Sequence, residues 1–368
     1  MTAVPLGLPR LGPARSGSAP GPAGATPTDA ADRPDLPGLI DRFGRAATDL
    51  RVSLTDRCNL RCTYCMPAEG LDWLPSAELL TDDELLRLIR IGTEDLGIDE
   101  VRFTGGEPLL RRGIVELIGR VAALPRRPRQ SLTTNGLGLV RKATALAAAG
   151  LDRINVSLDT MDPVVFDRLT RRDRHSDVVA SLAAAAAAGL TPVKINTVLM
   201  RGVNDHEAPA LLTFALANGY QLRFIEQMPL DAQHSWERTQ MITADEILAM
   251  LSATFTLSPH AAPRAGAPAE LFDAVGPDGA RGQVGIIASV TRPFCGDCDR
   301  TRLTADGQIR NCLFSATETD LRGLLRGGAG DAEIADTWRA AMWVKLPGHG
   351  INDPSFLQPD RPMSAIGG

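Results

Sequence analysis

The sequence has no excess of basic residues. Its 39 Lys and Arg are outnumbered by 44 Asp and Glu, which gives a formal net charge of -5. General nucleic-acid binding depends on a basic stripe that faces the phosphates, so this charge balance argues against a nucleic-acid partner. Any anionic ligand must therefore be held by a local group of cations.

Long apolar runs are missing as well. The longest weakly polar stretch, VVASLAAAAAAGL from Val178, is shorter than the roughly 20 residues that a membrane helix needs, and it predicts an ordinary buried helix face. Residues 1–37, rich in Pro, Gly, Ala and Ser, contain no apolar core of a signal peptide. We therefore expect a cytoplasmic protein with no membrane partner and a disordered arm over residues 1–37.

Cysteine is scarce and falls into two groups. The six cysteines are Cys58, Cys62 and Cys65 in the run CNLRCTYC, and Cys295, Cys298 and Cys312 near the other end. An even number can indicate disulfides, but spacings of two to three residues in a long chain without a secretory signal suit a metal better.

The first cysteine group predicts a reactive metal centre. Iron-sulfur cubanes normally take four thiolates, so three ligands leave one iron open for another molecule. A structural zinc site is the alternative, although zinc favours paired C-x2-4-C units and a closed tetrahedron. For the second group the residues alone do not decide, because soft thiolates bind both zinc and iron-sulfur clusters.

Six strand-like runs alternate with helical patterns, which predicts a parallel α/β sheet. Each run alternates apolar with polar residues, whereas strands buried on both faces should be continuously apolar. Helices over the apolar face would leave Arg51, Arg102 and Lys194 in a polar barrel lumen. Six such units predict an open, partial TIM-type barrel with a wet ligand cavity, since a closed barrel packs apolar side chains inside. The runs begin at Leu50, Glu100, Gln130, Arg153, Val193 and Leu222.

The repeat ends near residue 255, where the stretch PHAAPRAGAPAE follows from Pro259. Such a composition marks a boundary. We therefore predict a barrel over residues 38–255 and a C-terminal region over residues 256–368 that carries the second cysteine group and folds back on the open barrel mouth. A strand-like segment from Gln283 leads into that group.

The candidate site lies where the strands end. Ligands of parallel α/β folds bind beyond the carboxyl ends of the strands. The first cysteine group follows the first strand, the run GGEP from Gly105 follows the second, and Ser157 ends the fourth. Two glycines let a backbone approach a ligand closely, with a plain strand-to-helix turn as the alternative.

Three segments together resemble one enzyme family: LRVSLTDRCNLRCTYCMP from Leu50, CGDCDRTRLTADGQIRNCLF from Cys295, and the terminal MSAIGG. The CxxxCxxC run resembles that of the radical S-adenosylmethionine (SAM) enzymes, in which the open iron binds SAM. The three segments together resemble the GTP 3′,8-cyclases of molybdenum cofactor biosynthesis, over nearly everything after residue 45. This resemblance implies a partial barrel, SAM as cofactor and two 4Fe-4S clusters.

The resemblance also implies roles for residues at matching motif positions. The first cluster would be held by Cys58, Cys62 and Cys65, and the second, with its open iron facing the purine, by Cys295, Cys298 and Cys312. SAM would contact Tyr64, Gly106, Ser157 and Met228. GTP would contact Arg51, Arg102, Thr133, Lys194, Arg300, Thr301 and Arg302. Arg300 and Arg302 would also poise the final reduction, and the terminal Gly367 and Gly368 would reach into the active site.

The cations fit such a substrate. Triphosphate recognition needs several converging cations, with Arg favoured for bidentate contacts. No Walker-type GxxxxGK[ST] run is present, so GTP would be held as a substrate without the apparatus of a GTPase.

In the implied reaction, a 5′-deoxyadenosyl radical takes hydrogen from the 3′ carbon of GTP, and the new carbon radical attacks carbon 8 of guanine to give 3′,8-cyclo-7,8-dihydro-GTP. The family also implies a homodimer, a reductant such as flavodoxin or ferredoxin, and a cyclic pyranopterin monophosphate synthase that takes the product. Two alternatives stay open: a peptide-modifying radical SAM maturase, which usually carries more C-terminal cysteines, and a zinc-stabilised binding protein.

Overall fold

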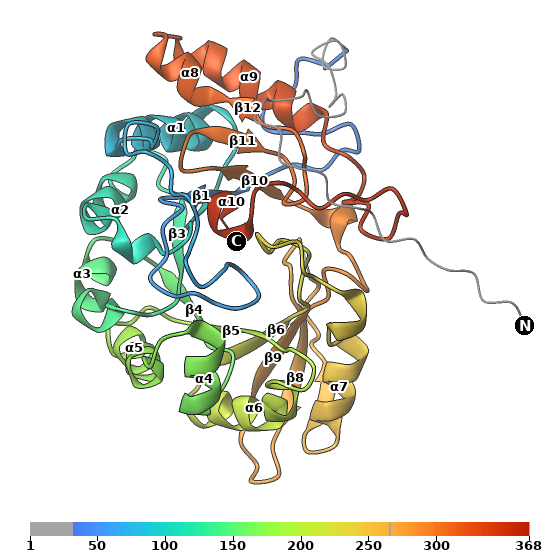
Figure 1. The fold of residues 1–368 in the computed structure, drawn as a ribbon. Helices are drawn as coiled ribbons and strands as arrows, with labels where there is room; N and C mark the ends of the chain where they lie inside the picture. The colour runs from blue at the N-terminus through green and yellow to red at the C-terminus, as the bar shows by residue number, and fades with distance from the viewer. Residues whose placement is uncertain (1–31, 265, 368) are drawn as a thin grey trace, which may run out of the picture.

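One twelve-stranded sheet forms the frame of the fold (Figure 1). The computed structural model describes residues 32–264 and 266–367, so most of the predicted arm and the terminal Gly368 lie outside the described residues. The strands are β1 (Asp49–Ser53), β2 (Glu100–Thr104), β3 (Arg129–Thr134), β4 (Arg153–Ser157), β5 (Val193–Val198), β6 (Gln221–Ile225), β7 (Thr256–Pro259), β8 (Glu270–Val275), β9 (Arg281–Ile287), β10 (Arg300–Leu303), β11 (Gln308–Arg310) and β12 (Thr319–Asp320).

The six predicted strands are confirmed as β1 to β6, which pair in sequence order and in parallel. Two further parallel strands flank them: β10 pairs with β1, and β9 pairs with β6. Within the described ranges the edge strands β7 and β12 do not pair with each other. The sheet therefore curves without closing, as predicted for a partial barrel.

Residues beyond 255 continue the same sheet at both of its edges. The antiparallel strands β7 and β8 extend it beyond β9, and β11 and β12 extend it beyond β10. The Pro-rich stretch connects β7 to β8. The boundary predicted near residue 255 thus falls within one continuous hydrogen-bonded sheet.

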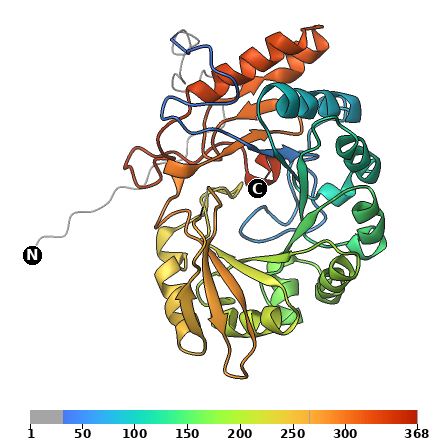
Figure 2. The same ribbon diagram turned by 180° about the vertical axis from the view of Figure 1, so that it is seen from behind.

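Helices cover the outer face of the sheet, and the chain end lies within the barrel (Figures 1 and 2). The first helix begins directly after Thr81, whose side chain forms a capping box with Glu84. No helix in the described part of the chain is long and apolar enough to cross a bilayer. The helices are α1 (Asp82–Asp95), α2 (Ile114–Ala122), α3 (Ala143–Ala148), α4 (Pro163–Thr170), α5 (His175–Ala187), α6 (Ala208–Ala217), α7 (Ala244–Ser252), α8 (Leu321–Arg326), α9 (Asp331–Trp343) and α10 (Met363–Ile366).

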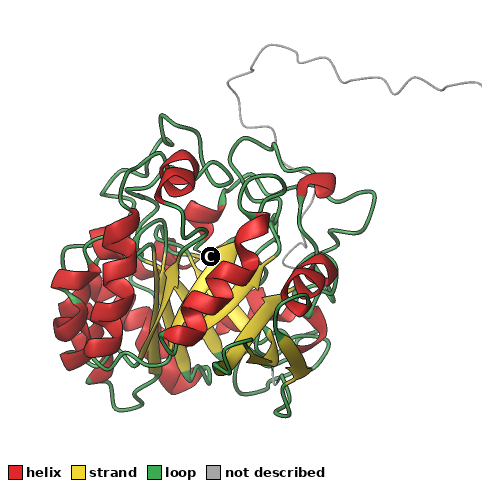
Figure 3. Ribbon diagram, turned by 90° about the horizontal axis from the view of Figure 1, so that it is seen from below, coloured by secondary structure: helices red, strands yellow, loops and turns green. Residues whose placement is uncertain are grey.

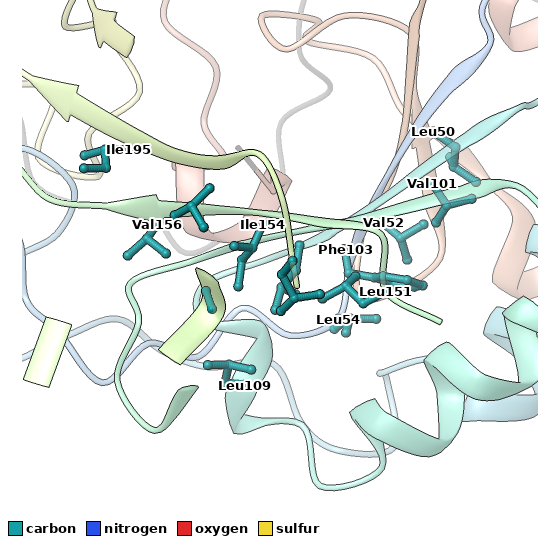
Figure 4. Close-up of a cluster of buried hydrophobic side chains, with 14 of the residues drawn as sticks. Leu50, Val52, Leu54, Val101, Phe103, Leu109, Leu151, Ile154, Val156 and Ile195 are labelled. Carbon is teal, nitrogen blue, oxygen red and sulfur yellow. The ribbon is translucent and has the colours of Figure 1, made fainter. Parts of the chain in front are cut away.

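The core lies between the sheet and these helices. The apolar members of each alternating strand, such as Val52, Phe103 and Ile195, are fully buried there (Figure 4). Their polar neighbours face the opposite side, inside the barrel. The strands are seen from another side, with helices flanking them, in Figure 3. The alternation therefore gives the sheet one face for stability and one for ligands.

Candidate active site

The first cysteine group lies on the loop after β1 and borders a cavity of about 310 Å³ inside the barrel. The loop is fixed from outside by Arg171, which donates hydrogen bonds to the carbonyl oxygens of Arg61 (2.8 Å) and Met66 (3.2 Å). The backbone of Arg61 also bonds to Thr170 at the end of α4. All three thiols line the cavity, so the loop presents them to one common space.

These thiols need a cation to ionise. Burial raises the pKa of Cys65 to about 12, with Cys58 adding to the effect. Burial also raises the pKa of Cys62 well above its ordinary value, helped by Asp159. A thiol that binds a metal loses its proton outright. A bound metal centre would therefore supply the positive charge that these thiols need in order to ionise.

The run GGEP joins this loop to β2. A Cβ at Gly106 would lie 2.3 Å from the carbonyl oxygen of Arg57, so only glycine allows the two backbones to approach. The carboxylate of Glu107 then accepts hydrogen bonds from the Thr134 hydroxyl (2.6 Å) and the backbone N–H of Asn135 (2.7 Å). The two glycines thus serve the packing of the cysteine loop, and they also line the cavity.

The four residues predicted to contact SAM all line the same cavity. They are Tyr64, Gly106, Ser157 and Met228. Tyr64 is oriented by a hydrogen bond of 2.7 Å to Asp159, a residue that sequence reasoning did not select. Burial raises the pKa of Asp159 to about 6.

The second cysteine group borders an adjoining cavity of about 80 Å³. The residues common to both cavities are Met228, Ser289, Phe294, Arg300, Arg302 and Leu313. The two cysteine groups, more than 200 residues apart in the chain, therefore border two cavities that share six lining residues.

The donor set of each cysteine group fits an iron-sulfur cluster. Each group places three thiols at the edge of a cavity. Such clusters are held by Cys thiolates and normally take four, so three thiols would leave one iron open toward the cavity.

Three arginines lie side by side on neighbouring strands inside the barrel. Arg51 of β1 is in register with Arg102 of β2 on one side and with Arg302 of β10 on the other. Arg51 and Arg102 are partly neutralised by Asp49 and Glu100, at 3.2 Å and 2.8 Å. Although Asp49 is buried, Arg51 and Arg102 lower its pKa to about 2.

Cationic side chains still outnumber these carboxylates. Arg300 lies two residues before Arg302 on the same face, and its NH2 group has no hydrogen-bond partner among the described residues. Lys194 of β5 is a further cation on the inner face of the sheet, but it is not one of the residues that line the cavity. Burial, reinforced by Arg223, Arg153 and Arg102, lowers the pKa of Lys194 to about 7. This excess of positive charge suits a polyanionic ligand.

Arg223 on β6 is a cation that sequence reasoning missed. It is 5% exposed and borders the cavity, and among the described residues it donates only to the neutral amide oxygen of Asn196, at 3.0 and 2.7 Å. Burial lowers its pKa well below the ordinary value, and Arg102 and Arg51 add to this. The alternation in LRFI, with Leu222 and Phe224 in the core, would have placed it in the lumen.

Two predicted GTP contacts differ in how they face the cavity. Thr133 lines it and accepts a hydrogen bond of 3.1 Å from Asn155. The side chain of Thr301 points to the opposite face of β10, where its hydroxyl accepts a hydrogen bond of 3.0 Å from Trp338. Alternation along the strand requires this, because Arg300 and Arg302 face inward. Only the backbone of Thr301 is oriented to serve the site.

The end of the chain enters the barrel lumen (Figure 1). Met363 and Ser364 line the cavity, and the carbonyl oxygen of Gly367 accepts a hydrogen bond of 2.7 Å from Arg302. Arg361 anchors the segment by ion pairs to Asp306 at 2.7 Å and to Glu318 at 2.9 Å. The final Gly368, also predicted to act here, lies outside the described residues.

Comparisons with known proteins agree with this arrangement. The radical SAM superfamily matches residues 52–215, and Molybdenum Cofactor Synthesis C matches residues 220–351. A GTP 3′,8-cyclase of Mycolicibacterium smegmatis is 62% identical over the full length of both chains. The chain belongs to the GTP 3′,8-cyclase family.

Other members of the family are comparably similar. The GTP 3′,8-cyclase of Streptomyces coelicolor is 66% identical over 90% of this chain and 96% of that protein. The GTP 3′,8-cyclase of Corynebacterium glutamicum is 61% identical over 90% of this chain and 89% of that protein. Among solved structures, native anSMEcpe with bound AdoMet reaches a TM-score of 0.43 at 19% identity, over 56% of this chain and 59% of that chain. Family membership rests on the sequence relatives, since that structural likeness is too low to add to it.

Proposed function

We propose that this protein is a GTP 3′,8-cyclase that rearranges GTP to 3′,8-cyclo-7,8-dihydro-GTP in the first step of molybdenum cofactor biosynthesis. The observation that carries the proposal is that two cysteine groups, an excess of buried cations and the chain end border two adjoining cavities that share lining residues. A binding protein would need only one of these features.

The first cysteine group and the residues around it are assigned to the binding of SAM. The thiols of Cys58, Cys62 and Cys65 would hold a 4Fe-4S cluster, and Tyr64, Gly106, Ser157 and Met228 would contact SAM. When bound, this cluster and SAM would supply a 5′-deoxyadenosyl radical that removes hydrogen from the ribose.

The substrate end belongs to the second cysteine group. Cys295, Cys298 and Cys312 would hold a second 4Fe-4S cluster beside the guanine base. Arg51, Arg102, Lys194 and Arg223 hold the triphosphate by charge-assisted hydrogen bonds, with Thr133 and the backbone of Thr301 beside them. Arg300, Arg302 and the glycines of the tail lie near the reacting atoms and poise the final reduction.

The proposal extends to the surroundings of the enzyme. We infer a cytoplasmic homodimer that receives electrons from flavodoxin or ferredoxin and passes its product to a cyclic pyranopterin monophosphate synthase. A peptide-modifying maturase is less compatible, because the buried cations of the lumen suit a polyanion better than a peptide. A zinc-stabilised binding protein is less compatible because the chain belongs to the GTP 3′,8-cyclase family.

Anaerobic turnover tests the proposal. Reconstituted and reduced protein is incubated with SAM, with and without GTP, and the products are followed by mass spectrometry. We expect 5′-deoxyadenosine and an isomer of GTP to form together and only when GTP is present. Formation of 5′-deoxyadenosine with GTP unchanged would keep the radical SAM chemistry but contradict the substrate.

A further inference from the structure

Lys345 is a buried lysine whose ammonium points at the second cysteine group. The residue is 4% exposed, and its Nζ lies 3.3 Å from Cys298 Sγ. The same nitrogen donates to the carbonyl oxygens of Cys298 (3.2 Å) and Arg300 (3.1 Å). An ammonium has three donors, and all three are directed at this short segment. None of these bonds goes to a carboxylate, the usual partner of a buried cation.

The contact with Lys345 falls on one sulfur of the group. Lys345 Nζ lies 3.3 Å from Cys298 Sγ, and Arg300, two residues further along the chain, borders the same cavity as Cys298. Two cations therefore flank Cys298, Arg300 on the side of the cavity and Lys345 on the other side.

Lys345 reaches the sulfur from behind the site. It follows α9, which is fixed to the outer side of β10 by the hydrogen bond from Trp338 to Thr301, and Asn311 donates to the carbonyl of Ala341 at 2.8 Å. Arg300 borders both cavities, whereas Lys345 lines neither. A substrate in the cavity can therefore contact Arg300 but not Lys345, so any role of Lys345 is exerted through Cys298.

We propose that Lys345 is a positioning residue for the second cluster, which orients Cys298 through its contact with the sulfur and raises the reduction potential of that cluster. The inference rests on the proposed function, because it requires a cluster at the second cysteine group. Net charge and hydrogen bonds to the sulfurs are among the factors that set iron-sulfur potentials. A nearby cation stabilises the reduced cluster because reduction adds negative charge.

The test compares midpoint potentials in the reconstituted full-length enzyme. Lys345→Gln keeps hydrogen-bond donors but removes the charge, and Lys345→Arg keeps the charge. Lys142→Gln is the matched control, because the Lys142 ammonium instead donates to the Leu109 carbonyl at 2.9 Å. Iron and sulfide are counted first, and each cluster is then titrated by electron paramagnetic resonance, with added SAM identifying the first cluster.

We expect both clusters in every variant and a lower potential for the second cluster in Lys345→Gln alone. Equal second-cluster potentials in wild type and Lys345→Gln would overturn the inference. If Lys345→Gln lacks the second cluster, retention in Lys345→Arg supports the role of the charge, and loss in both variants leaves only a packing role and overturns it. Wild-type protein that binds a single cluster would instead contradict the proposed function.

Discussion

Arg302 donates a hydrogen bond of 2.7 Å to the carbonyl oxygen of Gly367. This bond joins β10, the strand between Cys298 and Cys312, to the end of the chain inside the barrel. Arg302 is also in register with Arg51 of the first strand. The tail thus completes the wall of a site whose other parts come from both ends of the sequence.

The fit of the tail can be tested by Gly367→Ala. Gly367 has a φ of +84°, and a Cβ there would lie 2.9 Å from Thr104 Cγ2 and 3.1 Å from Ser53 Cβ. We expect the variant to displace the tail and to lower turnover by up to roughly 100-fold, with cluster content and thermal stability unchanged. Ala365→Ser, on the short helix of the same tail, is the control. Equal turnover in both variants would show that the position of Gly367 is unimportant.

Arg223→Ala should weaken GTP binding. The buried guanidinium has only Asn196 as a hydrogen-bond partner among the described residues, so a triphosphate would supply the missing anion. Loss of a hydrogen bond to a charged group corresponds to a Kd raised roughly 10- to 100-fold. The matched control is Arg201→Ala, which removes an arginine that is 43% exposed and paired with Glu246. Loss of iron in Arg223→Ala would point to a structural role instead.

The first cysteine group should be required for cleavage of SAM, and the second for conversion of GTP. Cys62→Ser is expected to abolish formation of 5′-deoxyadenosine, because the first cluster would lose a ligand. Cys298→Ser is expected to impair conversion of GTP while leaving the absorption of the first cluster largely intact. The measurements are iron content, visible absorption and both products. Identical losses in the two variants would contradict the division.

Binding of GTP should be linked to a proton on Lys194. Its pKa in the free protein is lowered to about 7, mainly by burial, so the side chain is largely neutral at about pH 8 and charged at about pH 6. A bound triphosphate favours the ammonium. GTP affinity should therefore fall as pH rises through 7, with uptake of up to about one proton per GTP at the higher pH.

Calorimetry in buffers of different ionisation enthalpy measures this proton. Lys194→Arg should abolish the uptake, because arginine stays charged throughout, whereas Lys142→Arg should retain it. Binding heats that do not depend on the buffer at about pH 8 would show that Lys194 does not titrate with GTP.

Alternation within each strand was sufficient to predict much of this site. The pattern in LRVSL and EVRFT put Arg51 and Arg102 in the lumen and Val52 and Phe103 in the core, and the structure agrees. The same rule would have found Arg223. It would also have turned the side chain of Thr301 outward, since Thr301 lies between two inward-facing arginines.

Pairing between distant segments could not be predicted in this way. Nothing in the local pattern near Arg300 says that β10 pairs with β1, and so the register of Arg302 with Arg51 was not predictable. The sequence also gave no indication that Lys345 contacts Cys298, because a lysine after a helix is ordinarily solvated. The role of Gly106 in packing against Arg57 depends on a contact between two loops, which appears only in the folded chain.

The central claim is that this cavity brings the 3′ carbon of GTP to the radical derived from SAM. The most direct test is turnover with GTP deuterated at the 3′ carbon, followed by mass spectrometry of the 5′-deoxyadenosine. The account predicts that one deuterium appears in 5′-deoxyadenosine as the GTP isomer forms. GTP consumed with no deuterium in the 5′-deoxyadenosine would contradict it.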